Sequence, residues 1–280
     1  MNKTIYILLF LTITATNSTI AQEQYPENSV RFLQQILQQG NKNEYYGSEL
    51  SSEELMQTMS KYDFSGIWQQ KNDALLGFIG ENYQRLNIKF ITIVKNSDDS
   101  TKYYVYGKSM VGTNICPFIG EIKLLHVRQV EIETIYKQTL YSEFQDEESA
   151  ERYLAPEYVL LAKYSFFEDP KATGSGKFEG ILKTNFYIYN EMVYYNDLRI
   201  EVSDPYNNNQ CVGTWTSYLT GVSKTCNWGE FRIPYSGDLD IGAGLFSPDS
   251  KYLGNGWYNY SKAWIYQDTE AQKKEREKWW

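Results

Sequence analysis

Several acidic side chains of this sequence stand where carboxylates could catalyse hydrolysis. Glu168-Asp169, Glu230 and the pair Asp238 and Asp240 fall at expected strand ends or in loops, where glycosidase carboxylates often lie. The chain also holds 35 Asp and Glu residues, so acidic pairs arise by chance and no spacing singles one out. A carbohydrate-active hydrolase that uses Glu230 with a loop acid is therefore one hypothesis, but the pattern favours a protein without catalytic residues.

Asp238 and Asp240 are also candidate metal ligands. They stand in the glycine-rich stretch 236–244, where carboxylate and backbone oxygens suit Ca²⁺. The stretch lacks the distant bidentate glutamate of an EF-hand loop, so an Asx turn without metal is the competing interpretation.

His126 is the single histidine of the chain. It stands in an alternating segment beside Leu124, Arg128 and Val130, where we expect a structural role. One histidine excludes multi-histidine zinc sites, and no GxSxG motif supplies the serine of a catalytic triad. No GxGxxG or GxxxxGK[ST] motif is present either, so we expect no cofactor.

Aromatic residues are abundant: 25 tyrosines contribute to an aromatic content of 16%. Such residues suit half-buried strands, and in exported proteins they also bind sugars and other flat ligands. The candidate ligand-binding residues are Trp68, Tyr104, Tyr106, Phe186, Trp215, Trp228, Glu230 and Arg232.

Several of these residues belong to the stretch Cys211–Pro234, which alternates and turns once at Thr220-Gly221. Two alternating runs around a short glycine-containing turn predict a β-hairpin. A two-residue loop places Gly213 opposite Trp228 and Trp215 opposite Cys226. One face then carries Gly213, Trp215, Cys226, Trp228, Glu230 and Arg232.

The three cysteines, Cys116, Cys211 and Cys226, are an odd set. In the predicted register Cys211 and Cys226 lie four residues apart along the hairpin, roughly 13 Å. A disulfide requires Cα atoms within about 7 Å, so we predict no Cys211–Cys226 bond and buried free thiols.

The chain divides into four segments: an export signal (1–21), a helical segment (22–62), a strand-rich domain (63–265) and a charged helix (266–280). In the helical segment, Asn28 or Ser29 caps one helix that ends at Gly40. Ser51 and Glu54 form a capping box for a second. The stretch 145–153 predicts a helix or lid that interrupts the strand-rich domain.

The alternating pattern of residues 63–265 predicts an all-β fold. Alternating runs separated by turn residues are expected at 66–70, 74–79, 86–95, 103–108, 118–125, 126–136, 158–167, 177–183, 184–189, 192–200 and in the hairpin. Short connections indicate antiparallel up-and-down pairing, and this many strands must curl or close. We therefore expect a barrel or strongly curved sheet, with a two-sheet sandwich as the alternative.

The formal net charge of -8 and the lack of a basic cluster disfavour nucleic-acid binding. The apolar run in 5–11 is too short to span a membrane, and no later stretch is apolar enough. We expect a periplasmic or extracellular protein.

Gly66-Ile67-Trp68, the second Gly-x-Trp at Gly213–Trp215, and Arg232 resemble the lipocalin/calycin family. That resemblance implies that Trp68 closes the barrel floor beneath Arg232 through a cation–π contact. The stretches Gly107–Gly120, CNWGEFRIP and GDLDIGAG also resemble uncharacterised exported proteins of Bacteroidetes-type bacteria, which implies no activity.

Three functions follow as hypotheses. The first is a barrel that binds a small or apolar ligand among its aromatic side chains. The others are the hydrolase above and an envelope protein whose N-terminal helices and tryptophan-ended tail dock a partner protein.

Overall fold

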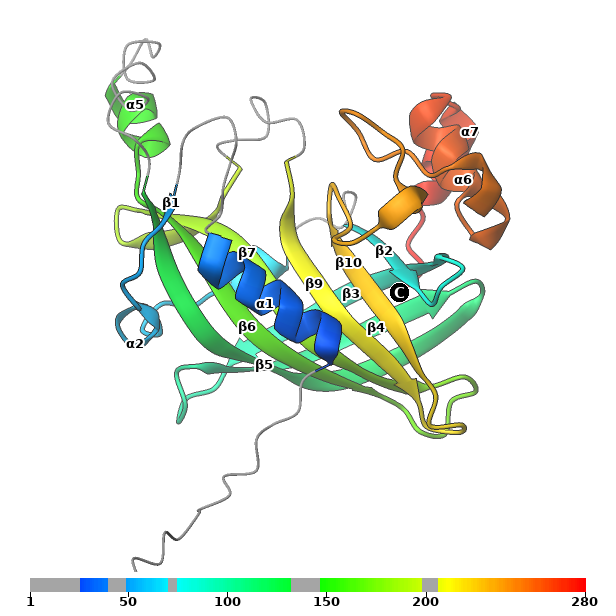
Figure 1. Ribbon diagram of the computed structural model, residues 1–280, viewed down its shortest axis with the longest axis horizontal. Helices are drawn as coiled ribbons and strands as arrows, with labels where there is room; N and C mark the ends of the chain where they lie inside the picture. The colour runs from blue at the N-terminus through cyan, green and yellow to red at the C-terminus, as the bar shows by residue number, and fades with distance from the viewer. Residues whose placement is uncertain (1–25, 40–48, 70–74, 132–146, 198–205) are drawn as a thin grey trace, which may run out of the picture.

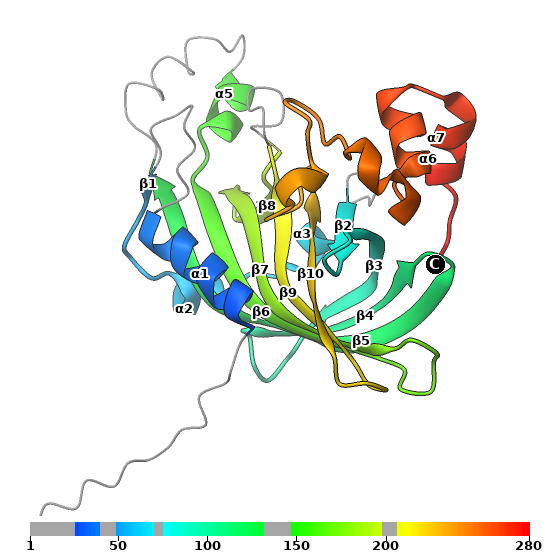
Figure 2. The same ribbon diagram turned by 45° about the vertical axis from the view of Figure 1, so that its right-hand side comes forward.

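The protein folds around one ring-like, mostly antiparallel sheet (Figures 1 and 2). The computed structural model describes residues 26–39, 49–69, 75–131, 147–197 and 206–280. Its strands are β1 (Glu49–Leu50), β2 (Leu75–Ile79), β3 (Gln84–Lys95), β4 (Lys102–Val111), β5 (Asn114–Glu131), β6 (Glu157–Glu168), β7 (Gly176–Tyr189), β8 (Met192–Tyr195), β9 (Asn208–Ser217) and β10 (Ser223–Glu230).

The helices lie outside the sheet or at its ends. They are α1 (Glu27–Gln39), α2 (Met56–Met59), α3 (Ser65–Trp68), α5 (Glu147–Tyr153), η2 (Gly237–Leu239), η3 (Ser250–Asn255), α6 (Tyr258–Tyr260), η4 (Ser261–Ile265) and α7 (Thr269–Glu275). In the described part of the chain, no helix is long and apolar enough to cross a membrane.

The sheet closes on itself. Its order is β1-β5-β4-β3-β2-β10-β9-β7-β6, and β6 pairs again with β5, while β8 adds to β7. Each neighbouring pair is antiparallel, so the expected all-β fold with a strongly curved sheet is confirmed.

The interior of the ring is filled by pairs of a glycine and an aromatic residue. Gly107 lies opposite Phe118, Gly120 opposite Phe166, Gly180 opposite Tyr164, and Gly77 opposite Trp228. A Cβ on any of these glycines would come within 3.0 Å of the facing aromatic side chain. The missing side chains therefore leave room for the rings, which stack along β5 and β6: Phe118–Phe166 and Tyr164–Phe166 each have centroids 5.1 Å apart.

Two separate layers cover the outside of the ring (Figure 1). Helix α1 packs Phe32 and Ile36 on Val159 and Ile181, and its Ser29 Oγ donates to the Val212 carbonyl at 2.8 Å. The C-terminal segment packs Phe246 and Trp257 on the outward side chains of β2, Leu76 and Phe78. Both segments therefore pack against their own sheet.

The structure corrects several predicted elements. The run 66–70 is predicted as a strand, but residues 66–68 belong to helix α3, and its Ile67 and Trp68 lie in the core inside the ring. The run 118–125 and the described part of the run 126–136 belong to one strand, β5, with a register shift between Leu124 and His126. The runs 177–183 and 184–189 likewise form the single strand β7.

The hairpin β9–β10 forms, but with a different register. Cys226 lies opposite Gly213 and Trp228 opposite Cys211, a shift of two residues from the prediction. The cause is a longer loop, in which the Ser217 N–H donates to the Val222 carbonyl and the Gly221 N–H to the Ser217 carbonyl. A shift of two preserves the faces, so Trp215, Cys226, Trp228 and Glu230 still point inward, whereas Arg232 lies beyond the strand.

The three cysteines are free and buried, as predicted. The described part of the helix predicted at 145–153 is confirmed as α5. The predicted capping box at Ser51 is wrong, because α2 begins at Met56 and its N-cap residue makes no side-chain cap hydrogen bond. Glu54 instead accepts from the Val127 N–H at 2.9 Å and contacts His126 Nδ1 at 2.7 Å, which gives His126 the expected structural role. The predicted helix stop at Gly40 lies outside the described residues.

Candidate functional site: an aromatic groove on the outer face

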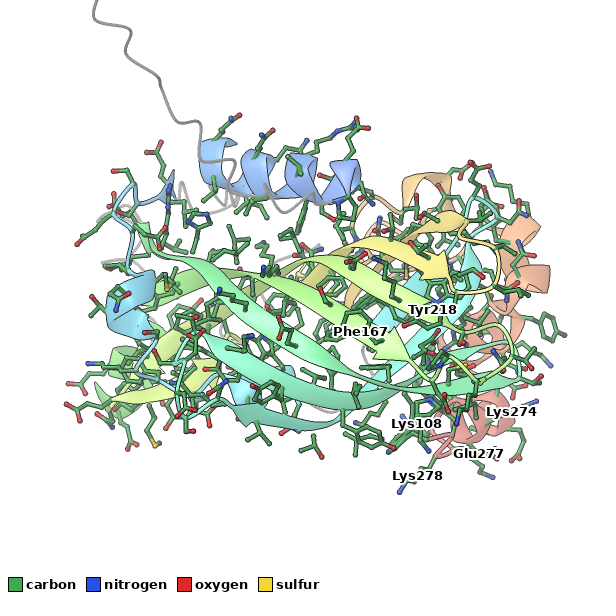
Figure 3. The ribbon with its side chains drawn as sticks, turned by 90° about the horizontal axis from the view of Figure 1, so that it is seen from below. Lys108, Phe167, Tyr218, Lys274, Glu277 and Lys278 are labelled. Atoms are coloured by element: carbon green, nitrogen blue, oxygen red, sulfur yellow. The ribbon has the colours of Figure 1, made fainter. Side chains whose placement is uncertain are left out.

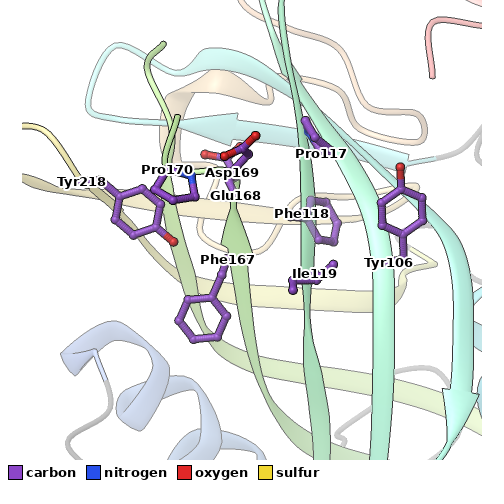
Figure 4. Close-up of a pocket in the computed structure, with 9 residues that line it drawn as sticks. All are labelled: Tyr106, Pro117, Phe118, Ile119, Phe167, Glu168, Asp169, Pro170 and Tyr218. Atoms are coloured by element: carbon purple, nitrogen blue, oxygen red, sulfur yellow. The ribbon is translucent and has the colours of Figure 1, made fainter. Parts of the chain in front are cut away.

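A groove of about 470 Å³ lies at one end of the ring, where strands β4, β5 and β6 meet the β9–β10 loop (Figure 4). Tyr218 and Phe167 stand on one side of it and Tyr106 on the other (Figure 4). The nine described residues that line it are Tyr106, Pro117, Phe118, Ile119, Phe167, Glu168, Asp169, Pro170 and Tyr218.

Strand pairing places the exposed apolar side chains of the groove next to one another. Tyr106 lies opposite Ile119, and Ile119 lies opposite Phe167, so one cross-strand row runs over β4, β5 and β6. Ile119 is 65% exposed, Phe167 45%, and Tyr106 and Tyr218 40% each. Phe167 and Tyr218 lie near each other in Figure 3, outside the area that α1 covers. An apolar row left open to solvent is typical of a binding surface.

Glu168 forms the buried end of this groove. Its side chain is 4% exposed, and its carboxylate accepts hydrogen bonds from Ser109 Oγ, from the Gly176 N–H at 2.8 Å and from Trp215 Nε1 at 2.9 Å. Burial raises the pKa of Glu168, and the three donors oppose that rise. With both oxygens occupied by the protein, Glu168 orders the groove wall and is poorly placed to act on a substrate.

Four aromatic residues predicted to line a ligand cavity belong to the packed core. Trp68, Phe186 and Trp228 are at most 4% exposed, and Trp215 is 9% exposed. Trp68 donates to Thr184 Oγ1 at 2.9 Å and packs edge-on against Tyr103. Since ring stacking and hydrogen bonds hold these side chains, they fill the interior instead of offering a surface. Tyr104 and Tyr106 point outward, and among the eight predicted ligand-binding residues Tyr106 is the one in the groove lining.

Glu230 and Arg232 are outside the groove lining, and they bind different partners. Glu230 is 5% exposed, accepts from Tyr195 OH and Asn209 Nδ2, and burial raises its pKa. Arg232 donates to Asp240 and to the carbonyls of Gly242, Ala243 and Gly244. In the described part of the chain, Arg232 makes no cation–π contact with Trp68, which corrects the closing pair implied by the lipocalin resemblance.

The two candidate metal ligands have protein partners. Asp240 accepts from Arg232 and from the backbone N–H groups of Gly242 and Ser247, each at 3.0 Å. Asp238 pairs with Lys251 Nζ at 2.6 Å and Tyr252 OH at 2.8 Å. Within the described ranges, no group of three or more His, Cys, Asp or Glu side chains is placed to hold a metal ion.

Sequence reasoning missed Ile119, Phe167 and Tyr218. A signal for the first two exists in the doublets Phe118-Ile119 and Phe166-Phe167. Strand alternation points one member of each doublet outward, where a polar residue is expected on a solvated face. No comparable signal marks Tyr218, because the predicted two-residue loop places it in a strand, whereas it lies in the longer loop of the structure.

The buried hydroxyl of Tyr164 offers a test of the packing inside the ring. In the described structure Tyr164 OH is buried without a hydrogen-bond partner, between Gly180 and Gly213. We expect Tyr164→Phe to leave the free energy of unfolding unchanged or to raise it by about 1 kcal/mol, because an unsatisfied buried hydroxyl costs stability. Chemical denaturation measures this change.

Tyr103→Phe is the matched control. Tyr103 OH accepts from the Phe64 N–H and donates to the Tyr62 carbonyl, both at 3.2 Å, so its loss is expected to destabilise by about 1 kcal/mol. Equal destabilisation by the two variants would contradict the placement of Tyr164.

Comparison of the chain with protein-family models, curated proteins and solved structures gave no match. The fold and the groove define the class of protein: a closed antiparallel ring with an aromatic groove on its outside.

Proposed function

We propose that this is an exported, non-enzymatic protein that binds a small apolar ligand, and that the ligand occupies the outer groove. The groove supports this proposal by its size, since small-molecule sites commonly measure about 300–1,000 Å³. It also combines exposed aromatic walls with few polar groups, which is the usual composition of such sites. Export rests on the sequence of residues 1–21.

The observation that carries the proposal is the exposed row Tyr106, Ile119 and Phe167 beside Tyr218. A ligand seated there removes four large apolar side chains from water, and burial of each aromatic or aliphatic group is favourable. The ring interior supports binding less well, because aromatic stacking already fills its inward rows.

The uncharged fluorescent probe N-phenyl-1-naphthylamine tests the proposal. We expect its emission to rise on binding to the protein, and we expect Phe167→Ala to weaken binding about tenfold, the effect of removing one aromatic anchor. The control is Tyr266→Ala, which removes an aromatic ring that is 74% exposed and outside the groove lining. Absence of saturable binding, or equal effects of the two variants, would contradict the proposal.

A further inference from the structure

We propose that the groove selects organic cations, that is, ligands with an apolar body and a protonated amine or quaternary ammonium group. This inference rests on the proposed function, because it names the class of ligand that the same groove accepts. It depends on the charge of the lining residues and on the aromatic rings beside that charge.

The lining carries negative charge only. Of the nine described residues around the groove, Glu168 and Asp169 are acids and none is Lys, Arg or His. A negative charge next to apolar walls attracts a cation more strongly than it would in open water, because the walls exclude solvent. The same charge disfavours anionic ligands.

Asp169 is the acid that a ligand can reach. It is exposed, and its Oδ1 accepts from the Lys171 N–H at 2.9 Å, a turn contact that leaves the second carboxylate oxygen open. No ion pair involves Asp169 among the described residues. Figure 4 places Asp169 and Glu168 between the Tyr218 side and the Pro117 side of the groove.

Nearby lysines do not cancel this charge from within the groove. Lys177 lies opposite Phe167, but its Nζ pairs with Glu179 at 2.6 Å. Lys108 lies opposite Pro117, and both Lys108 and Lys171 are outside the groove lining.

The aromatic rings add a second attraction for cations. Tyr106, Phe167 and Tyr218 line the same groove as Asp169, and the face of each ring attracts an ammonium group through its quadrupole. Carboxylate and rings together favour a cation over a neutral molecule of the same shape. An uncharged ligand retains the apolar contacts and loses both of these attractions.

Displacement of groove-bound N-phenyl-1-naphthylamine tests the inference with two isosteric competitors. Benzyltrimethylammonium carries the charge, and neopentylbenzene has a carbon atom in place of its nitrogen. We expect the cation to displace the probe at a concentration about tenfold or more below that of the isostere. We expect Asp169→Asn to remove most of this preference.

Asp98→Asn is the matched control, because it makes the same change of net charge at an exposed position of the β3–β4 turn. Equal displacement by both competitors, no displacement by either, or equal effects of the two variants would overturn the cation preference while the groove remains a ligand site. Failure of the probe to bind in the groove at all would remove the proposed function as well.

Discussion

Replacing Gly213 with alanine is expected to lower the free energy of unfolding by about 3 kcal/mol or more. A Cβ at this position would lie 2.1 Å from the Glu179 carbonyl oxygen and 2.4 Å from Tyr164 OH. Overpacking a core costs about 1–3 kcal/mol when side chains can adjust, and here the nearest contact is backbone of the paired strand β7. Thermal and chemical denaturation measure the loss.

Gly66→Ala is the control for the general effect of adding a methyl group. Gly66 lies in helix α3 and has no atom within 4 Å of an added Cβ. Because alanine favours helix over glycine by about 1 kcal/mol, we expect a neutral or slightly stabilising change. If the two variants had the same melting temperature, the close approach of β7 and β9 described here would be wrong.

Glu275→Gln is expected to detach the C-terminal segment from the ring. Arg85 on β3 donates to both oxygens of Glu275, at 2.9 and 2.6 Å, and the two side chains are only 15% and 11% exposed. The guanidinium also lies 5.4 Å from the ring centroids of Trp257 and Tyr260. Leaving such a buried charge without its carboxylate costs about 3–5 kcal/mol, so helix α7 should lose protection from hydrogen exchange.

Glu270→Gln removes an acid of the same helix from an exposed pair with Lys273, whose side chains are 71% and 79% exposed. Surface pairs of this kind contribute about 0–1 kcal/mol, so we expect exchange in α7 to stay nearly unchanged. The prediction fails if both variants leave α7 equally protected, since Arg85 and Glu275 would then not hold the segment.

The sequence predicted only part of the aromatic row in the groove. Tyr106 was predicted as a ligand-binding residue, but its partners Ile119 and Phe167 come from strands that are far from it in sequence. These three side chains lie next to one another only because β4 pairs with β5 and β5 pairs with β6. No pattern within a single strand determines these registers.

Cation preference depends on tertiary structure in the same way. Asp169 is one of 35 acids in the chain, and its sequence context resembles that of many others. It becomes distinctive because Pro170 and Tyr218 bring apolar surface next to it. Of the other acids that the sequence indicates as candidates, Asp238 and Asp240 are bound by Lys251 and Arg232.

The sequence by itself determined the all-β class and the inward face of the β9–β10 hairpin. Both features follow from alternation with period two, which a shift of the hairpin by two residues leaves intact. Only the tertiary structure decided which aromatic residues are core and which are surface. Glycines on neighbouring strands admit the inward rings, so Trp228 and Phe166 fill the interior, and closure of the ring leaves Phe167 and Tyr218 facing solvent around the groove.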